Sequence, residues 1–261
     1  MSEFRRVVLA LVLGRIAQAR LRSALTASDE IRFFETVADV REALADSAHA
    51  LMVLMEAKDV SGDPTAPLFR FLTDHAPAIV TIGFLPHASP SAGIRDLVNS
   101  GVNALIQEGV DDFGMALRAA YDGGIEACAA RAVRRALDPI VAGEPRVLVD
   151  YCLQYPREDL SIAGLARALG CDRKTLWNTT ARMGLPAPSD LVIWSRLFLA
   201  AAILESTGYT VEKVALQLSF ASPSAFRNAC RRHAKQKPAE WRRPGGLAQC
   251  ISAFVDHRTS K

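Results

Sequence analysis

The feature of this 261-residue chain that most constrains its fold is a change of pattern near the middle. Before it, short apolar runs alternate five times with segments of helical spacing, whereas after it every segment has helical spacing. The apolar runs are rich in Val, Ile and Leu with little polar alternation, which is typical of strands buried on both faces of a parallel sheet. We therefore predict a five-stranded, doubly wound, flavodoxin-like α/β domain followed by an all-α domain.

The expected elements follow one another at short intervals. The strands are expected within 5–13, 31–38, 50–56, 78–85 and 102–109, and the helices within 15–27, 39–47, 66–76, 91–101 and 111–127. A helical segment with several arginines follows, and Asp138-Pro139 should end it because proline has no amide hydrogen to donate. We predict an α/β domain at 1–127, a connecting helix and linker at 128–145, a helical domain at 146–244 and a tail at 245–261.

The two halves of the chain differ in charge. Residues 1–143 contain 14 Lys and Arg against 18 Asp and Glu, a net −4, whereas residues 144–261 contain 17 against 10, a net +7. This asymmetry suggests a polyanionic partner for the second half only. The five cysteines show no CxxC spacing and the histidines are scattered, so we predict no disulfide framework, no metal site and no cofactor.

Nothing in the sequence indicates an enzyme or a membrane protein. The longest apolar run near the start, 7–13, is far shorter than the roughly 20 residues that a membrane span needs. No glycine-rich phosphate loop follows the first expected strand, and no nucleophile, histidine and acid motif is recognisable. We therefore expect a cytoplasmic protein with no catalytic residues and no membrane partner.

Residues 161–184 have the pattern of a helix-turn-helix unit. Ser161 is a favoured N-cap for a first helix, whose apolar residues fall on one face. Gly170 can turn the chain through a left-handed conformation, and Asp172 can cap a second helix. The exposed face of that second helix carries side chains that bond phosphates or base edges or cover thymine methyl groups: Arg173, Lys174, Trp177 and Asn178.

The same plan recurs about fifty residues later. Thr210 can cap a first helix, residues 219–220 form the turn, and Ser222 can cap a second helix with Pro223 at its first position, where proline is favoured. The residues of this helix expected to face outward are Ser224, Arg227, Asn228, Arg231 and Arg232. A long helix expected at 188–207 would hold the two units rigidly apart. Units about one DNA turn apart, roughly 34 Å, could enter successive major grooves.

From residue 160 to 242 the chain resembles the AraC/XylS-type DNA-binding domain. The matching pieces are LSIAGLARALGCDRKTL, SRLFLAAAILESTGYTVEKVALQLSFASPSAF and KPAEWR, and they lie within about a third of the chain. The resemblance implies a sequence-specific transcription regulator of the bacterial type. It implies core or turn roles for Ala166, Leu176, Ala215, Phe220, Phe226 and Pro238.

The resemblance also implies roles on the DNA. The implied base-reading residues are Lys174, Trp177 and Asn178 in one groove, and Ser224, Arg227 and Asn228 in the other. The candidates for phosphate contacts are Arg173, Ser222, Arg231 and Arg232. Two alternatives stay open, because Trp177 could be a core aromatic and the two neighbouring arginines could lie on a solvated helix face. Trp194 and Trp241 are predicted to be packing residues.

The chain departs from the family's pattern at four places. Ser219 and Lys235 stand where glycine is usual, and Cys230 stands where a large aromatic residue is usual. The first reading helix is one residue short before Gly184. These departures are expected to affect how both reading helices are oriented on DNA, whereas the fold is expected to be kept.

The first half resembles, by pattern alone, a response-regulator receiver domain. Receiver chemistry needs acids after the first strand to hold Mg²⁺, an aspartate after the third strand to accept a phosphoryl group, and a lysine after the fifth. Here the first strand ends LVLGR, the third ends at Met55-Glu56 and the fifth at Gln107-Glu108. We therefore predict a pseudo-receiver for dimerisation or signal input. Glu56 could mimic a charged state, but solvated loop positions are the favoured interpretation of Glu56, Lys58 and Asp59.

These observations favour a transcription regulator that binds double-stranded DNA. A homodimer formed through the first domain is expected, since two-fold partners suit inverted or repeated half-sites, and RNA polymerase is a further expected partner. Two other functions stay open. The chain could be a protein–protein adaptor, or a signalling protein that binds a ligand at the carboxyl ends of its strands, in either case with altered DNA binding.

Overall fold

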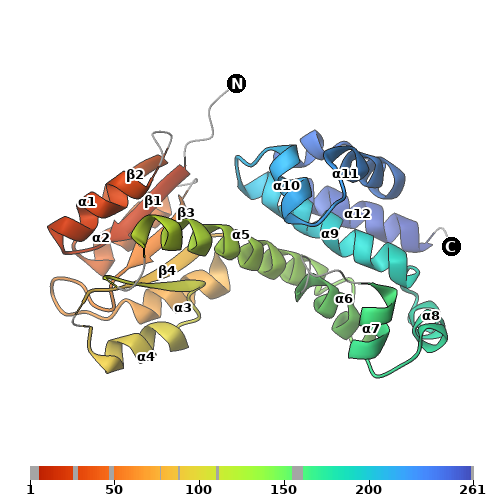
Figure 1. The fold of residues 1–261 in the computed structure, drawn as a ribbon, viewed down its shortest axis with the longest axis horizontal. Helices are drawn as coiled ribbons and strands as arrows, with labels where there is room; N and C mark the ends of the chain where they lie inside the picture. The colour runs from red at the N-terminus through yellow and green to blue at the C-terminus, as the bar shows by residue number, and fades with distance from the viewer. Residues whose placement is uncertain are drawn as a thin grey trace. The chain divides into compact units, whose positions relative to one another are not determined.

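The computed structural model describes residues 6–25, 29–46, 50–76, 78–87, 89–109, 112–154 and 161–259. Within these ranges an α/β unit is followed by helices alone, as the change of sequence pattern predicts (Figure 1). The chain divides into two compact units, Met1–Cys128 and Ala129–Lys261. The ends of several expected segments, among them residues 5, 47, 111 and 160, lie outside the described ranges. No described helix is both long and apolar enough to cross a membrane.

The first unit contains five parallel strands in the order β2-β1-β3-β4-β5. This is the flavodoxin-like order of a doubly wound sheet, so the predicted fold class is confirmed. The strands are β1 Arg6–Leu11, β2 Asp29–Phe33, β3 Ala50–Met55, β4 Val80–Leu85 and β5 Ala104–Gln107. The helices are α1 Arg15–Ala24, α2 Val37–Asp46, α3 Ala66–His75, α4 Ser91–Asn99 and α5 Phe113–Leu137.

Both faces of this sheet are covered. Leu9 and Val53 belong to one apolar layer together with buried residues of α2, α3 and α4. The intervening Val8 is also buried and points to the opposite face, because side chains alternate along a strand. On α5, Gly124 lies so close to the Val80 side chain that a Cβ would not fit without a shift. Burial on both faces explains why the strands lack polar alternation.

Helix α2 begins earlier than the sequence predicts. It starts at Val37 rather than at residue 39, because the hydroxyl of Thr36 accepts a hydrogen bond from the amide of Asp39 at 3.2 Å. Thr36 therefore caps the helix, and Asp39 lies in its first turn, where a carboxylate is favourable.

The second unit consists of helices. They are α6 Glu144–Gln154, α7 Ile162–Ala168, α8 Arg173–Arg182, α9 Pro188–Ser206, α10 Val211–Gln217, α11 Pro223–Ala229, the π-helix η1 Cys230–Ala234, the 3₁₀ helix η2 Pro238–Arg242 and α12 Gly246–Thr259. The long helix α9 packs against α6, α8, α10, η2 and α12. Trp194 and Trp241 are fully buried, so their predicted role in packing is confirmed.

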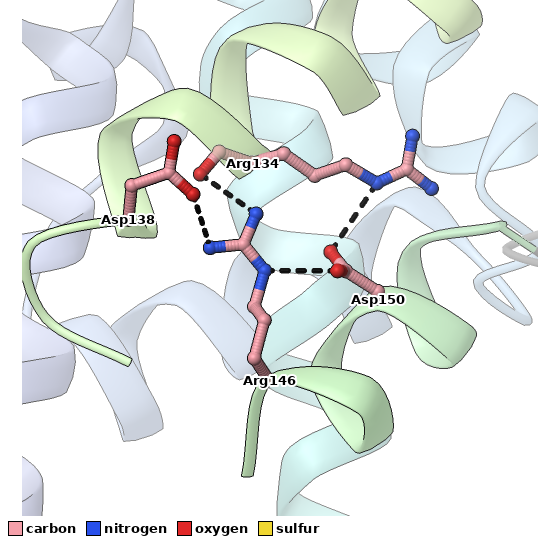
Figure 2. A network of polar contacts seen from close by, with 4 residues as sticks. All are labelled: Arg134, Asp138, Arg146 and Asp150. Carbon is pink, nitrogen blue, oxygen red and sulfur yellow. Dashed lines mark hydrogen bonds and ion pairs between the residues drawn. The ribbon is translucent and has the colours of Figure 1, made fainter. Parts of the chain in front are cut away.

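The segment expected to be a linker is tightly bonded. Helix α5 runs without a break to Leu137 and ends before Asp138-Pro139, as predicted, and α6 begins only seven residues later, at Glu144. Figure 2 shows how Arg146 joins the two helices. Its guanidinium donates to Asp138 Oδ1 at 2.7 Å and to the carbonyl of Arg134 at 3.0 Å, and its Nε lies 2.9 Å from Asp150 Oδ2. The last residues of the segment predicted as a linker therefore belong to the start of α6.

Helix α12, which lies in the segment predicted as a tail, is also part of the packed second unit. Helix α12 buries Cys250 and Phe254 completely. The Phe254 ring packs edge-on against the rings of Trp194 and Phe198, at centroid distances of 5.3 and 5.1 Å. Since α12 supplies apolar side chains to the core around α9, it is a structural helix. The finer boundaries predicted at residues 127, 145 and 244 stay predictions.

Candidate nucleic-acid interface

The first helix-turn-helix unit is formed by α7 and α8. The hydroxyl of Ser161 accepts a hydrogen bond from the amide of Gly164 at 3.0 Å, which caps α7. Gly170 has a φ of 64°, and the amide of the next residue, Cys171, returns to the carbonyl of Ala166 at 2.9 Å. Asp172 caps α8 by accepting from the amide of Thr175 at 2.7 Å. The caps and the left-handed turn lie where the sequence predicts them.

The second unit repeats this geometry in α10 and α11. Thr210 caps α10 by accepting from the amide of Lys213 at 3.1 Å, and Ser222 caps α11 by accepting from the amide of Ala225, also at 3.1 Å. The turn contains Ser219 with a φ of 57°, and the amide of Phe220 bonds the carbonyl of Ala215 at 3.0 Å. Each of these turn contacts matches one in the first unit, 49 residues earlier.

The residues that the family resemblance assigns to the core occupy it. Ala166, Leu176, Ala215 and Phe226 are at most 3% exposed. Phe220 is half-buried, and its ring packs against that of Phe226 at a centroid distance of 4.9 Å. Small and apolar side chains at these positions let each pair of helices approach closely, which fixes the second helix of each pair on the first.

The candidate DNA-contacting side chains of α8 lie on one exposed surface of the helix. Arg173, Lys174, Trp177 and Asn178 are all exposed, whereas Leu176 and Thr180 are buried against the unit. Trp177 is 46% exposed, so the alternative of a core aromatic is wrong. Hydrogen bonding to the amide of Thr175 lowers the pKa of Asp172, so this cap stays ionised and adds a negative charge at the helix start.

The candidate side chains of α11 and η1 are also brought together at the surface. Ser224, Asn228, Arg231 and Arg232 are exposed, and Ser222 and Arg227 are half-buried. The Arg227 guanidinium forms an ion pair with Glu212 in the first turn of α10. The Ser222 hydroxyl accepts a hydrogen bond from Ala225, which leaves its own proton available for a phosphate oxygen.

The residue that follows β3, at the carboxyl edge of the sheet in the first unit, is bonded to the loop after β1. Glu56, after β3, is half-buried and accepts a hydrogen bond from the amide of Leu13 at 2.8 Å. Burial and the nearby carboxylate of Glu108 raise its pKa, against the lowering effect of hydrogen bonds from Leu13 and Gly14. The interpretation of Glu56 as a solvated loop residue is therefore wrong.

Asp59 is likewise not solvated. It is 5% exposed and accepts hydrogen bonds from the amides of Val37, Ser61 and Asp63 at 2.9–3.0 Å. These bonds, chiefly the one from Val37, lower its pKa. Lys58 is exposed, as predicted. Among the described residues no three His, Cys, Asp or Glu side chains are grouped so that they could hold a metal ion.

Two contacts of the second unit escaped the sequence analysis. Neither the pairing of Arg227 with Glu212 nor the bridging by Arg146 has a motif, because each joins residues of two separate helices. Glu212 lies in the first turn of α10 and Arg227 in the last turn of α11, so the spacing along the chain gave no signal for this pair.

Residues 165–244 match the family described as "Helix-turn-helix domain". They form an AraC-type helix-turn-helix domain, as the sequence motifs predict. The match supports a DNA-binding regulator of transcription as the function of the chain. A comparison with curated proteins gave no match.

Several solved structures are similar to the chain at low identity. FixJ from B. japonicum is 15% identical, with a TM-score of 0.39, over 76% of this chain and 96% of that one. The response regulator StyR is 16% identical, with a TM-score of 0.39, over 72% and 96%. RcsB from Salmonella enterica serovar Typhimurium, bound to promoter rprA, is 13% identical, with a TM-score of 0.35, over 72% and 97%. At such TM-scores the assignment of the first unit as receiver-like rests on its own strand order.

Proposed function

We propose that the chain is a sequence-specific regulator of transcription that places α8 and α11 in successive major grooves of duplex DNA. The observation that carries this proposal is the repeated geometry of two capped helix pairs, each presenting exposed polar side chains on its second helix. A helix-turn-helix unit reads DNA with its second helix, whose first turns meet the base edges.

Each candidate residue has a role that its chemistry suits. Lys174, Trp177 and Asn178 on α8 would meet base edges in one groove, and Ser224, Arg227 and Asn228 on α11 would do so in the other. The candidates at or next to the ends of these helices would bond phosphates. Such contacts supply affinity and register without sequence preference. These candidates are Arg173, Ser222, Arg231 and Arg232. The net charge of +7 over residues 144–261 suits this partner.

The first unit would act as a dimerisation or input module without phosphorylation. In support, the position after β3 holds Glu56, whose carboxylate is already bonded to the amide of Leu13, and no lysine follows β5. A homodimer formed through this unit would pair two helical units on inverted or repeated half-sites. Such a regulator would work in the cytoplasm, with RNA polymerase as a further partner.

The experiment that tests the proposal is selection from a pool of random and genomic duplexes at two salt concentrations, followed by sequencing of the retained DNA. Recovery of one motif, with affinity falling steeply as salt rises, is the expected result. Retention without a motif would leave a non-specific DNA binder. No retention at low salt would contradict the proposal and favour the adaptor function.

A further inference from the structure

The first candidate reading helix, α8, has a small buried face. Of its ten residues, Leu176 and Thr180 are buried, and the helix packs against α7 and α9. The second half of α8 also borders a cavity of about 380 Å³, whose other wall includes His257 and Arg258 at the end of α12. A cavity offers few contacts to the helix that lines it. The orientation of α8 therefore depends on what holds its carboxyl end.

Arg258 of α12 contacts that end. Helix α8 stops at Arg182, and the chain turns at Gly184, which has a φ of 63°. The Nε of Arg258 donates a hydrogen bond to the carbonyl of Gly184 at 2.9 Å. A hydrogen bond from a charged guanidinium is stronger than one from a neutral donor. This bond ties the turn that ends α8 to α12.

The core of the second unit holds Arg258 in place. One turn earlier on α12, Phe254 is fully buried, and its ring lies 5.3 Å from that of Trp194 on α9. The guanidinium carbon of Arg258 lies 5.7 Å from the centroid of the Phe254 ring. The ring of His257 lies 5.7 Å from that of Trp194. The contact with Gly184 is therefore anchored on α9.

This contact comes from outside the helix-turn-helix domain, since α12 begins at Gly246, beyond residue 244. It meets the turn at Gly184, before which the first reading helix is one residue shorter than the family's pattern. Side chains that bond a partner specifically must be held to within about 0.5 Å of their productive positions. A bond that fixes the end of α8 therefore bears on which bases its exposed side chains reach.

We infer that Arg258 is a positioning residue for DNA recognition. By holding the carbonyl of Gly184, it sets the orientation in which α8 meets the base edges, and it does so without touching DNA itself. This inference rests on the proposed function, and it extends the recognition machinery to a helix that follows both helix-turn-helix units.

The test repeats the duplex selection with the full chain carrying Arg258→Ala. The motif positions read by α8 are those that change in Lys174→Ala or Asn178→Ala, and the positions read by α11 are those that change in Arg227→Ala. Arg258→Ala should lose the preference at the α8 positions and keep it at the α11 positions. Its Kd for the selected duplex should rise about tenfold, the equivalent of one weakened base contact.

Two further variants separate positioning from loss of charge. Arg258→Lys keeps a donor for the carbonyl of Gly184, so it should restore part of the preference at the α8 positions. Arg243→Ala removes the same charge from an exposed position shortly before α12 and should leave the motif unchanged. In Arg258→Ala the slope of log K against log salt should equal that of the unaltered chain. A slope lower by about one would reveal a direct phosphate contact and overturn the inference.

Hydrogen exchange gives a readout that needs no DNA. In Arg258→Ala the amides at the carboxyl end of α8 should exchange about tenfold faster, because that end has lost its bond to α12, while the amides of α11 should be unaffected. Equal exchange at the end of α8 in both proteins would overturn the inference.

The selection also distinguishes this inference from the proposed function. A motif that is unchanged in Arg258→Ala refutes only the positioning role. Loss of the whole motif refutes it too, because the bond would then serve the fold of the entire unit. If the unaltered chain selects no motif, the proposed function fails, and with it the role of Arg258 in recognition, whatever the exchange at α8 shows.

Discussion

The guanidinium of Arg227, on α11, forms an ion pair with the carboxylate of Glu212, on α10. The two side chains are 43% and 53% exposed, so the pair contributes at most about 1 kcal/mol to stability. The same guanidinium is a candidate base reader. Under the proposed function, Glu212 would compete with DNA for Arg227.

We expect Glu212→Gln to strengthen binding to a selected duplex by up to about fivefold, since the guanidinium is released from its partner. Arg227→Ala should weaken binding by about 1–3 kcal/mol and relax the preference at one base position. Fluorescence anisotropy with the two single variants and the double variant checks this. Strictly additive effects would show that the ion pair and the DNA contact are independent.

Residues that contact phosphates should be distinguishable from residues that contact bases by how their substitution changes the salt dependence of DNA binding. Arg173→Ala and Arg232→Ala should each lower the slope of log K against log salt by about one and weaken all duplexes alike. Lys174→Ala and Asn178→Ala should instead change the selected motif. Repeating the duplex selection at two salt concentrations with each variant distinguishes the groups. An unaltered motif in both Lys174→Ala and Asn178→Ala would remove α8 from the base-reading role.

The two turns offer a reciprocal test of backbone strain. Ser219 and Gly170 hold equivalent positions with φ of 57° and 64°. Gly170→Ser should destabilise the second unit by about 1–2 kcal/mol, because a Cβ in this conformation meets the following carbonyl. Ser219→Gly should stabilise it by up to about 1 kcal/mol, the gain being reduced by the greater freedom of glycine in the unfolded chain. Urea unfolding followed by tryptophan fluorescence reports this unit, since all three tryptophans lie within residues 144–261. Equal stabilities would refute strain at Ser219.

Removing the bridge between α5 and α6 should cost stability. Arg146→Ala deletes bonds to Asp138, to Asp150 and to the carbonyl of Arg134, and we expect a loss of about 2 kcal/mol. Arg146→Lys should recover only part of it, because an ammonium group lacks the planar fork of donors. Arg167→Ala, on the exposed side of α7, is the matched control and should change the free energy of unfolding by less than about 0.5 kcal/mol. The same urea titration measures all three.

Glu56 should make the first unit less stable as pH rises. Its pKa is raised in the folded unit, mainly by burial, so between the ordinary value of 4.5 and the folded value the native state holds more protons than the unfolded state. The free energy of unfolding therefore falls as pH rises through that window. Glu56→Gln keeps an acceptor for the Leu13 amide and should remove this dependence, whereas Glu42→Gln, at an exposed position of α2, should keep it. Hydrogen exchange of the β1 and β3 amides, compared between variants at each pH, gives the measurement. A pH dependence that persists in Glu56→Gln would assign it to another group.

Much of the fold follows from local patterns. The apolar runs specified the strands of a doubly wound sheet, because only residues buried on both faces can all be apolar. The starts of four helices followed from their N-cap residues, since a cap acts on amides only two or three residues away. These caps are Ser161, Asp172, Thr210 and Ser222. One local signal was assigned to the wrong residue, since the cap of α2 is Thr36 and not Asp39.

The sequence by itself therefore determined the class of both units and the helix pairs on which the candidate DNA contacts lie, since these depend on interactions within a few residues. Only the tertiary structure decided which of those side chains are paired and what α12 does. Arg227 meets Glu212, Arg146 joins α5 to α6, and Glu56 bonds the loop after β1. Such contacts join residues far apart in the chain. The sequence shows that these side chains are charged, but which groups they bond is decided only when separate helices and strands pack together.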